Sequence, residues 1–571
     1  MNSIKKENIK IPTYVPAEAL ELPMFFENKP YQGASGKLYP LPFSDSINDE
    51  KTDVEYEVYT LENEYIKVQV LPQIGGKILR AYDKTGNYDF VYYNEVIKPA
   101  LVGLAGPWIS GGIEFNWPQH HRPTTYMPLE AVAEEGKDGS KTVWTGEIEP
   151  FQRMKGMAGI SIEPGRSYIK AKIRIYNRTS QPQVFMWWAN LAAPAGDSYQ
   201  TIFPPDVEWV NDHDRRAVMS WPIAKGIYET ARPYDYGEGT DLSDYTAIKV
   251  PSSFLVSQGQ SDMDFVAGYD REKQKGIVTV ADHHIAPGKK LWHWGAGEFG
   301  DMWCSNLTDK NGPYIELMTG VYTDNQPDFT WIGPYETRYF EQIWYPIHEI
   351  GDVKNATAHA AINVEQKGDR LFIGVNTTGT YADAMVKVMY GTETIFEERV
   401  DMDPETAYLR YIPMNRMEFS RISAAVLYRE REELVTYRFC PKGVREPICV
   451  RKPVLPVDEI NTVEELYING LHLEQYKQHN YDARDYYLEG LRRDPGDIRC
   501  NTAMARLELK NGEFDTCIRH CDQALERQTM RNQHPDDTQA VSYTHLGKQT
   551  GGRGPGDTGR RRCRGRRGRT V

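Results

Sequence analysis

The chain has 571 residues, of which 40% are hydrophobic, and it carries 36 tyrosines, 12 tryptophans and a formal net charge of −13. This length predicts about three domains, and the apolar content is sufficient for large buried cores. The acidic balance argues against a nucleic-acid partner. No stretch of about 20 apolar residues is present, so we expect neither a membrane span nor a membrane partner.

The N-terminal residues lack the apolar core of a signal peptide. Seven cysteines are scattered along the chain without metal-type spacing. An odd count without a secretion signal favours a reducing, cytoplasmic location. Cys517 and Cys521 are four positions apart in a predicted helix, and we expect them to be small buried neighbours.

Residues 51–352 are predicted to form β-structure almost throughout, and residues 1–50 are expected to pack on this domain as an N-terminal extension. About 300 residues of short alternating strands predict a large antiparallel β-sandwich. The alternation of polar and apolar residues is clearest in four segments: 54–61, 65–71, 168–176 and 276–281.

A second β-block follows at residues 355–452, with typical strand patterns at 370–375 and 385–390. Its size of about 100 residues fits a small immunoglobulin-like sandwich. The proline-containing linker at 451–456 marks its end.

The period then becomes helical, and residues 464–497 align with 498–531 at an offset of 34. Small residues recur at matching places, which resembles the tetratricopeptide repeat over residues 458–531. The usual early tryptophan is replaced by Tyr467 and Asn501. Two repeats leave a stacking face open, so the resemblance implies a protein partner or self-association.

The Gly- and Arg-rich residues 532–571 are expected to be disordered. The stretch 540–546 resembles the peptide translated from sequencing-adapter DNA, so we interpret this tail as a sequence artefact that truncates a longer repeat array. A disordered linker is the alternative, and a basic arm for nucleic acid is disfavoured by the acidic body.

The segment 111–123 concentrates chemically active side chains between two glycines and two prolines. An indole face packs on the C–H surface of a sugar, and polar groups read its hydroxyls. The alternative is a polar β-hairpin without a ligand. The candidate residues in this segment are Glu114, Asn116, Trp117, His120, His121 and Arg122.

Three segments, 71–80, 111–118 and 312–320, are similar in order and spacing to the galactose-mutarotase-like superfamily. The nearest resemblance is to a DUF5107-like bacterial group with tetratricopeptide repeats behind the main domain. This resemblance implies a mainly β protein, a β-supersandwich whose concave face holds a mono- or oligosaccharide.

The chain also departs from this superfamily. Mutarotases carry an acid histidine on the strand that follows an Asn-x-Ser/Thr turn, which here is 177–180. Asn190 stands near that place, and an amide cannot exchange a proton at neutral pH. Trp188 on the same strand suits stacking on a sugar, or burial as a core aromatic.

Cleavage of a glycosidic bond needs two carboxyl groups across the sugar. Glu316 lies in an alternating strand and is expected to face the same side as Tyr314, and Glu114 follows a Gly-Gly turn. Apolar surroundings suit a carboxyl group as a proton donor. Glu336 and Glu341 are further candidates, one of which we expect to pair with Arg338.

His120 and His121 are predicted to point to opposite faces if they lie on a strand, and one of them is a candidate acid. His283 and His284 form a similar pair. No His-x-x-x-His spacing supports a metal site, so neither a metal nor another cofactor is expected. The candidate substrate-binding residues are Trp108, Asn116, Trp117, Arg122, Trp188, Asn190, His284 and Glu341.

Three functions remain open from the sequence. The first is a glycoside hydrolase acting on oligosaccharides, with Glu114, Glu316 and Glu336 as candidate carboxyl groups. The second is a non-catalytic sugar-sensing module whose repeats recruit a protein partner. The third is an epimerase or mutarotase in which His120 or His121 replaces the missing acid.

Overall fold

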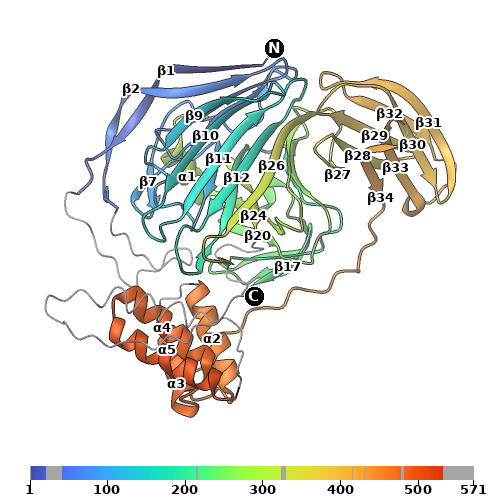
Figure 1. The fold of residues 1–571 in the computed structure, drawn as a ribbon. Coiled ribbons are helices and arrows are strands. Elements are labelled where there is room, and N and C mark those ends of the chain that lie inside the picture. The colour runs from blue at the N-terminus through green and yellow to red at the C-terminus, as the bar shows by residue number, and fades with distance from the viewer. Residues whose placement is uncertain are drawn as a thin grey trace, which may run out of the picture. The chain divides into compact units, whose positions relative to one another are not determined.

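A computed structural model describes residues 2–20, 41–213, 217–322, 329–414, 416–429, 431–476 and 481–531. These residues divide into two compact units, Met1–Lys452 and Pro453–Val571. The first unit is mainly β-sheet and the second is helical, in agreement with the predicted change of period (Figure 1). The predicted artefact at 532–571 lies outside the described residues.

The largest sheet has twelve strands in the order β1-β2-β3-β4-β8-β14-β24-β23-β20-β16-β17, with β5 paired to β4. The pairs are antiparallel, as the alternating pattern predicts. Its strands are β1 (Ser3–Pro16), β2 (Ile47–Glu62), β3 (Ile66–Leu71), β4 (Lys77–Asp83), β5 (Tyr88–Asp89), β8 (Ile113–Asn116), β14 (Trp187–Pro194), β16 (Trp209–Asn211), β17 (Val218–Ser220), β20 (Ser252–Val256), β23 (Gly288–His293) and β24 (Tyr314–Val321).

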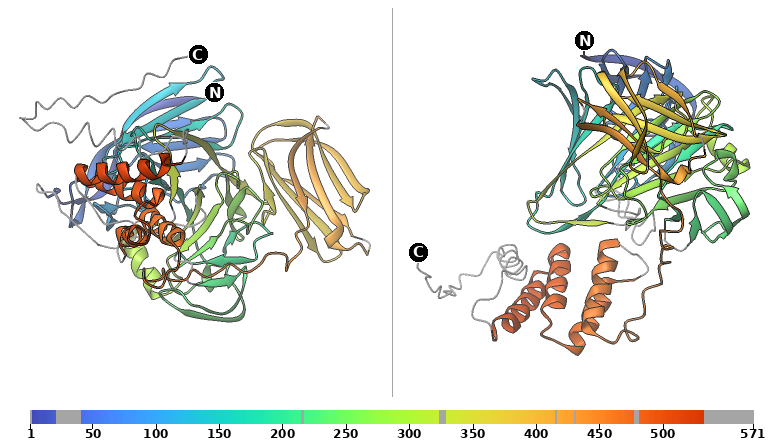
Figure 2. Two further views of the ribbon diagram at one scale, coloured as in Figure 1. Left: turned by 60° about the horizontal axis from the view of Figure 1, so that its bottom comes forward. Right: turned by 90° about the vertical axis from the view of Figure 1, so that its right-hand side faces the viewer.

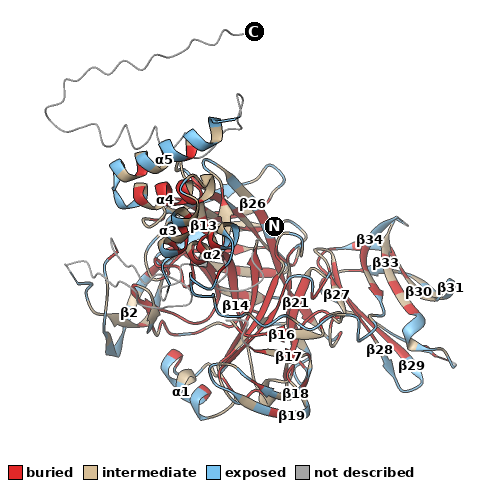
Figure 3. Ribbon diagram, turned by 90° about the horizontal axis from the view of Figure 1, so that it is seen from below, coloured by how far each residue is buried: buried red, intermediate tan, exposed pale blue. Residues whose placement is uncertain are grey.

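The second sheet has eight strands in the order β15-β21-β22-β26-β12-β11-β10-β9. The two sheets pack face to face, because side chains from both form one apolar core that includes Phe115, Leu191, Ile173 and Trp344. Strands of the large sheet such as β14 are accordingly buried (Figure 3). The strands of the second sheet are β9 (Glu130–Glu135), β10 (Lys141–Ile148), β11 (Lys155–Ile162), β12 (Ile169–Tyr176), β15 (Tyr199–Ile202), β21 (Phe265–Asp270), β22 (Lys275–Val280) and β26 (Thr337–His348).

Smaller elements are inserted between the strands of this sandwich. The helix α1 (Glu298–Leu307) interrupts the β-structure between β23 and β24, and no sequence pattern predicted it. The remaining elements are the pairs β6 (Ala100–Gly103) with β7 (Gly106–Trp108), β13 (Gln183–Phe185) with β25 (Thr330–Ile332) and β18 (Ile223–Tyr228) with β19 (Tyr234–Asp241), and the 3₁₀ turn Tyr245–Ala247.

Two four-stranded antiparallel sheets follow and face each other across their own core, which includes Ile373 and Val426 (Figure 2). One sheet contains β27 (Asn355–Ala356), β28 (Ala360–Lys367), β29 (Arg370–Thr377) and β32 (Tyr408–Pro413). The other contains β30 (Tyr381–Tyr390), β31 (Glu393–Met402), β33 (Ile422–Tyr428) and β34 (Glu432–Arg438), and a 3₁₀ turn covers Phe419–Arg421.

The second unit contains α2 (Val463–Tyr476), α3 (Ala483–Arg493), α4 (Ile498–Asn511) and α5 (Phe514–Thr529). Asp482 and Asp497 cap α3 and α4 by accepting backbone N–H groups, which satisfies donors that have no partner within a helix. Cys517 and Cys521 are fully buried in the same apolar cluster, as expected from their spacing. None of the described helices is long and apolar enough to cross a membrane.

Glu508 on α4 is buried, and burial raises its pKa to about 7. Its Oε1 lies 3.4 Å from His520 Nε2, and its Oε2 has no hydrogen-bond partner among the described residues. A raised pKa in the folded state means that ionisation destabilises the fold as the pH rises from about 4.5 to above 7.

We therefore expect Glu508→Gln to stabilise the helical unit by about 1–3 kcal/mol at pH 8, because the substitution removes the buried charge of a carboxylate that has one oxygen without a hydrogen-bond partner among the described residues. Hydrogen exchange of the full chain, measured by mass spectrometry, checks this result: α4 and α5 should exchange more slowly in the variant. The exposed Glu526→Gln on α5 is the control and should leave exchange unchanged. Faster exchange in Glu508→Gln at pH 8 would refute the assignment.

Candidate functional site

The candidate site lies on the face of the twelve-stranded sheet that points away from the sandwich core. Along β8, Ile113 and Phe115 belong to the core. Successive side chains of a strand alternate between faces, so Glu114 and Asn116 project from the opposite side. Both are buried despite their polarity.

The neighbouring strand β14 adds two side chains to this face. Trp187, Ala189 and Leu191 lie in the core, and Trp188 and Asn190 alternate with them. In the antiparallel register Asn190 is directly opposite Glu114, and Trp188 is opposite Asn116. Directly opposite residues are the closest side-chain neighbours in a sheet, so these four form one contiguous patch.

The second carboxylate comes from β24, on the other side of β14. Leu317 belongs to the core and Glu316 projects to the site face. Asn190 Nδ2 donates to Glu316 Oε2 at 3.4 Å, and Tyr314 OH donates to Glu316 Oε1 at 3.3 Å. Tyr314 therefore shares its face with Glu316, as the alternation predicts.

Glu114 is held by three hydrogen-bond donors. Thr125 Oγ1 donates to its Oε1 at 2.6 Å, Trp108 Nε1 donates to its Oε2 at 3.1 Å, and His121 Nδ1 lies 3.1 Å from the same oxygen. Burial alone would raise the pKa of Glu114, but His121, Lys77 and the hydrogen bonds outweigh it and lower that pKa. Glu114 is therefore a stable carboxylate.

Glu316 has the opposite tendency. Burial raises its pKa above the ordinary value of 4.5, and the neighbouring Glu114 carboxylate adds to the rise, against the opposing effects of His121 and Lys290. Two carboxyl groups on one face with opposite shifts form the arrangement in which one group holds a proton and the other holds a charge.

The two histidines lie together rather than apart. Residues 117–122 form a bend outside any strand, so the alternation expected for a strand does not apply, and the ring centroids of His120 and His121 are 3.7 Å apart. Asn190 Nδ2 lies 2.8 Å from His120 Nε2. Burial, together with the neighbouring His121, lowers the pKa of His120 well below its usual value.

Sequence reasoning missed a chain of polar groups made by Ser253 on β20, His213 after β16 and Lys290 on β23. Ser253 Oγ lies 2.7 Å from His213 Nδ1, and Lys290 Nζ lies 2.6 Å from His213 Nε2. Burial lowers the pKa of Lys290. Lys289 and Lys290, directly before Leu291 and Trp292, gave no signal, because a lysine in a strand is normally solvent-exposed.

Lys77 was also missed. It is buried at the start of β4, donates to Ile109 O at 3.2 Å, and burial lowers its pKa to about 8. The only signal in the sequence was its place directly after Gly75 and Gly76.

Two predicted substrate-binding residues of the segment 111–123 have other contacts. The Trp117 ring points into the sandwich core and packs against Gly156 of β11, where a Cβ would lie 2.1 Å from the indole. Arg122 is buried, donates to Gly75 O, and its Nε lies 3.5 Å from Glu147 Oε1.

Three further predicted residues are not brought to this face. Glu336 forms an ion pair with Arg338 at 2.8 Å, as expected for one of the two glutamates, and accepts from Gly333 N. Glu341 is exposed on β26 of the other sheet. His284 is exposed beside Asp282, in the turn between β22 and β23.

Three buried polar atoms of the patch have no hydrogen-bond partner among the described residues: Trp188 Nε1, Asn190 Oδ1 and Asn116 Nδ2. Two are donors and one is an acceptor. A buried polar atom without a partner costs about 1–3 kcal/mol, so this set suits a ligand with several hydroxyl groups.

Aromatic rings surround the patch. The Trp108 ring lies 5.2 Å from the His121 ring and 6.5 Å from Trp294, and Trp292 lies 5.4 Å from Trp294. Lys290 Nζ lies 6.0 Å from the rings of both Trp188 and Trp292. Indole faces next to hydrogen-bonding groups suit the mixed surface of a sugar.

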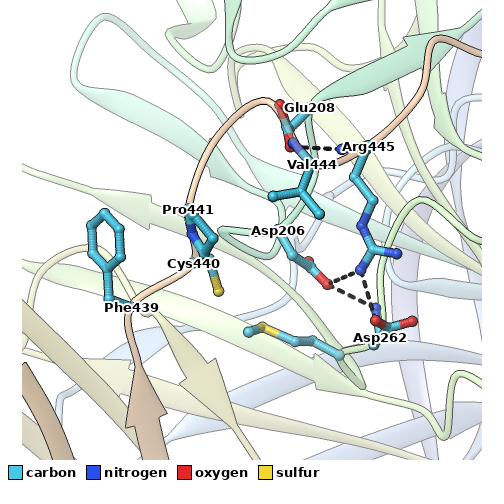
Figure 4. A pocket seen from close by; sticks show the side chains of 9 residues that line it. Asp206, Glu208, Asp262, Phe439, Cys440, Pro441, Val444 and Arg445 are labelled. Carbon is cyan, nitrogen blue, oxygen red and sulfur yellow. Dashed lines mark hydrogen bonds and ion pairs between the residues drawn. The ribbon is translucent and has the colours of Figure 1, made fainter. Parts of the chain in front are cut away.

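A separate pocket of about 280 Å³ lies beside residues 439–446, the segment that follows β34. Figure 4 shows Arg445 directed at Asp206 and Asp262, and the distances to their carboxylates are 3.1 Å and 2.7 Å. Phe439, Cys440 and Val444 give the pocket a largely apolar lining. The charge of Arg445 is thus paired with the two aspartate carboxylates.

The profile of a family described as "Domain of unknown function (DUF5107)" matches residues 34–347, and that of the "YphG-like protein, second domain" matches residues 355–437. A crystal structure of a TPR-domain containing protein from Parabacteroides distasonis is similar over 96% of this chain and 86% of that chain, with 17% identity and a TM-score of 0.52. This likeness shows a shared fold.

Weaker likeness extends to two smaller proteins. A putative mutarotase from Salmonella typhimurium has 12% identity, covers 52% of this chain and 91% of its own, and gives a TM-score of 0.37. A putative aldose 1-epimerase from Klebsiella pneumoniae has 10% identity, covers 52% and 80%, and gives 0.35.

Proposed function

The chain belongs to the DUF5107 family, and from the geometry of its buried polar face we propose that it is a carbohydrate-active enzyme, a glycoside hydrolase acting on oligosaccharides. One observation carries the proposal. Glu114 and Glu316 share one face of one sheet, on strands that flank β14, and their pKa values are displaced in opposite directions.

In this reaction Glu316 donates a proton to the oxygen that leaves the sugar, and the water that adds to the anomeric carbon returns a proton to the Glu316 carboxylate. The Glu114 carboxylate stabilises the positive charge that develops on the ring, because its three donors keep it ionised. Trp188 Nε1 and Asn190 Oδ1 bind sugar hydroxyls, since neither atom has a hydrogen-bond partner within the described parts of the chain.

An epimerase or mutarotase is the second candidate, and the position of His120 favours it. His120 lies 2.8 Å from Asn190, the residue that stands near the superfamily's acid histidine, so an imidazole is present there through another part of the chain. Such an enzyme exchanges protons on a free sugar and cleaves no bond between sugars.

The test is incubation of the purified full chain with a panel of α- and β-linked oligosaccharides, followed by NMR in heavy water. A hydrolase releases shorter sugars. An epimerase or mutarotase gives no release, but changes the rate of anomer exchange or incorporates deuterium at carbon. If the sugars bind and neither change occurs, the sensing module replaces both proposals.

We further propose that α2–α5 are two tetratricopeptide-type repeats that recruit a protein partner or a second copy of the chain. Residues such as Ile468 and Leu488 support this, because they are apolar and exposed on the helices. Light scattering of the full chain and of an Ile468→Ser/Leu488→Ser variant separates self-association from a monomer.

A further inference from the structure

We propose that Glu114, His120 and His121 form a binding site for one divalent transition-metal ion, with zinc as the preferred ion. Nothing in the sequence indicated this site, because two ligands are adjacent in the chain and the third lies six positions before them. The site depends on the bend after β8, which turns both imidazoles toward the carboxylate.

The geometry of the three side chains matches the requirement of a small ion. One ligand atom from each residue lies within 4.8 Å of the other two, and His121 Nδ1 is 3.1 Å from Glu114 Oε2. Ligands about 2.1 Å from a tetrahedral zinc ion lie about 3.4 Å apart. Small side-chain rotations therefore suffice to bring all three to one ion.

The donor set and the surroundings favour zinc. Two imidazoles and one carboxylate are the ligands that zinc takes in sites that keep a fourth position for water. All three residues are at most 6% exposed, so little ordering entropy is lost on binding. Hard-oxygen ions such as Mg²⁺ are disfavoured by the two nitrogen ligands.

Contacts behind the ligands hold them in place. Trp108 Nε1 and Thr125 Oγ1 donate to the Glu114 carboxylate, and the Asn190 amide contacts His120. Outer contacts of this kind orient metal ligands. Lys77, a buried lysine whose charge acts on Glu114, directs a hydrogen bond to Ile109 O rather than to the carboxylate.

A second group on the described residues provides a matched control. Asp282, His283 and His284 also place ligand atoms within 4.8 Å of one another. Asp282 and His284 are exposed, and His283 already pairs with Asp264 at 2.7 Å. A tight site is therefore expected at the buried group and not at this one.

The experiment strips the full chain with a chelator and titrates it with ZnCl₂ at pH 7.5 by calorimetry, with elemental analysis after gel filtration. We expect one ion per chain. His120→Ala and Glu114→Gln should each weaken binding by more than about 100-fold, since the loss of an outer contact alone costs about 10- to 100-fold. His283→Ala/His284→Ala should leave it unchanged.

Thermal unfolding separates a lost ligand from a lost fold. Zinc should raise the unfolding temperature of the wild type and not that of the His120→Ala variant, while both metal-free proteins unfold alike. Replacement by Co²⁺ should give the visible absorption of a tetrahedral site. Absence of zinc from the wild type, or full binding by His120→Ala, overturns the proposal.

This inference shares Glu114 with the proposed hydrolysis, but the two proposals have separate measurements. If the stripped chain still releases sugars and binds no zinc, the metal site fails and the hydrolase remains. If zinc binds and no glycan is processed, the hydrolase proposal fails and the metal site remains.

Discussion

Glu316→Gln is expected to lower kcat/KM for the cleaved oligosaccharide by about 10²- to 10⁴-fold, the usual contribution of a general acid. The amide keeps the shape of the side chain: its oxygen can still accept from Asn190, and its NH2 group can donate to the Tyr314 hydroxyl oxygen, but it has no acidic proton to give. Initial rates of sugar release measure the effect. KM should change little, because the ground-state contacts remain.

The pH profile distinguishes loss of an acid from loss of a merely structural carboxylate. The raised pKa of Glu316 means that its proton persists above pH 4.5, so activity should continue beyond that value and decline as the pH rises through the raised pKa. Glu341→Gln, at an exposed position on β26 of the other sheet, is the control and should keep both the rate and the profile. Full activity of Glu316→Gln would remove Glu316 from the mechanism.

Gly112→Ala is expected to destabilise the large sandwich by more than about 4 kcal/mol and to abolish soluble expression or lower the unfolding temperature sharply. Gly112 has φ +68°, and a Cβ there would lie 2.0 Å from the backbone oxygen of Ile78 on β4. The backbone cannot move freely, because Gly112 N donates to Tyr92 O and Gly112 O accepts from Ala192 N. Tryptophan fluorescence during urea unfolding measures the loss.

Gly165→Ala provides the matched control. Gly165 has nearly the same φ, +67°, but a Cβ there meets no atom within 4 Å. Its cost should be limited to the left-handed backbone, about 1–2 kcal/mol. Equal effects of the two substitutions would show that close approach of β4 and β8 is not what requires Gly112.

Much of the β-architecture was accessible from the sequence because strands that are half-buried have a two-residue period. The predicted segments 65–71 and 168–176 correspond to β3 (Ile66–Leu71) and β12 (Ile169–Tyr176). The predicted mainly β character and the change to helices near residue 460 are confirmed. Strand order was not predictable, because pairing between distant strands leaves no local pattern.

A site residue could be predicted where a polar residue lies between apolar residues of a strand. Glu316 lies between Ile315 and Leu317, and this pattern identified its face. Lys290 could not be found in this way, because it lies near Trp188 of the distant strand β14 as well as near Trp292 of its own strand. For Trp117 the sequence was misleading. Its position near His120 suggested a contact with the ligand, but its ring packs in the core against Gly156 of the distant strand β11, which has no side chain to block it.

The contact between Glu208 and residues 443–445 has a practical consequence for dividing the molecule. The Glu208 carboxylate accepts three successive backbone N–H groups from Gly443, Val444 and Arg445, at 2.6, 3.0 and 3.1 Å. A shortened chain that stopped at either profile boundary, residue 347 or 437, would remove all three donors together with the Arg445 side chain. Recombinant fragments intended for crystallisation should therefore extend beyond Glu446, so that Glu208 of the first β-domain keeps its three backbone donors, which lie 235 to 237 positions downstream.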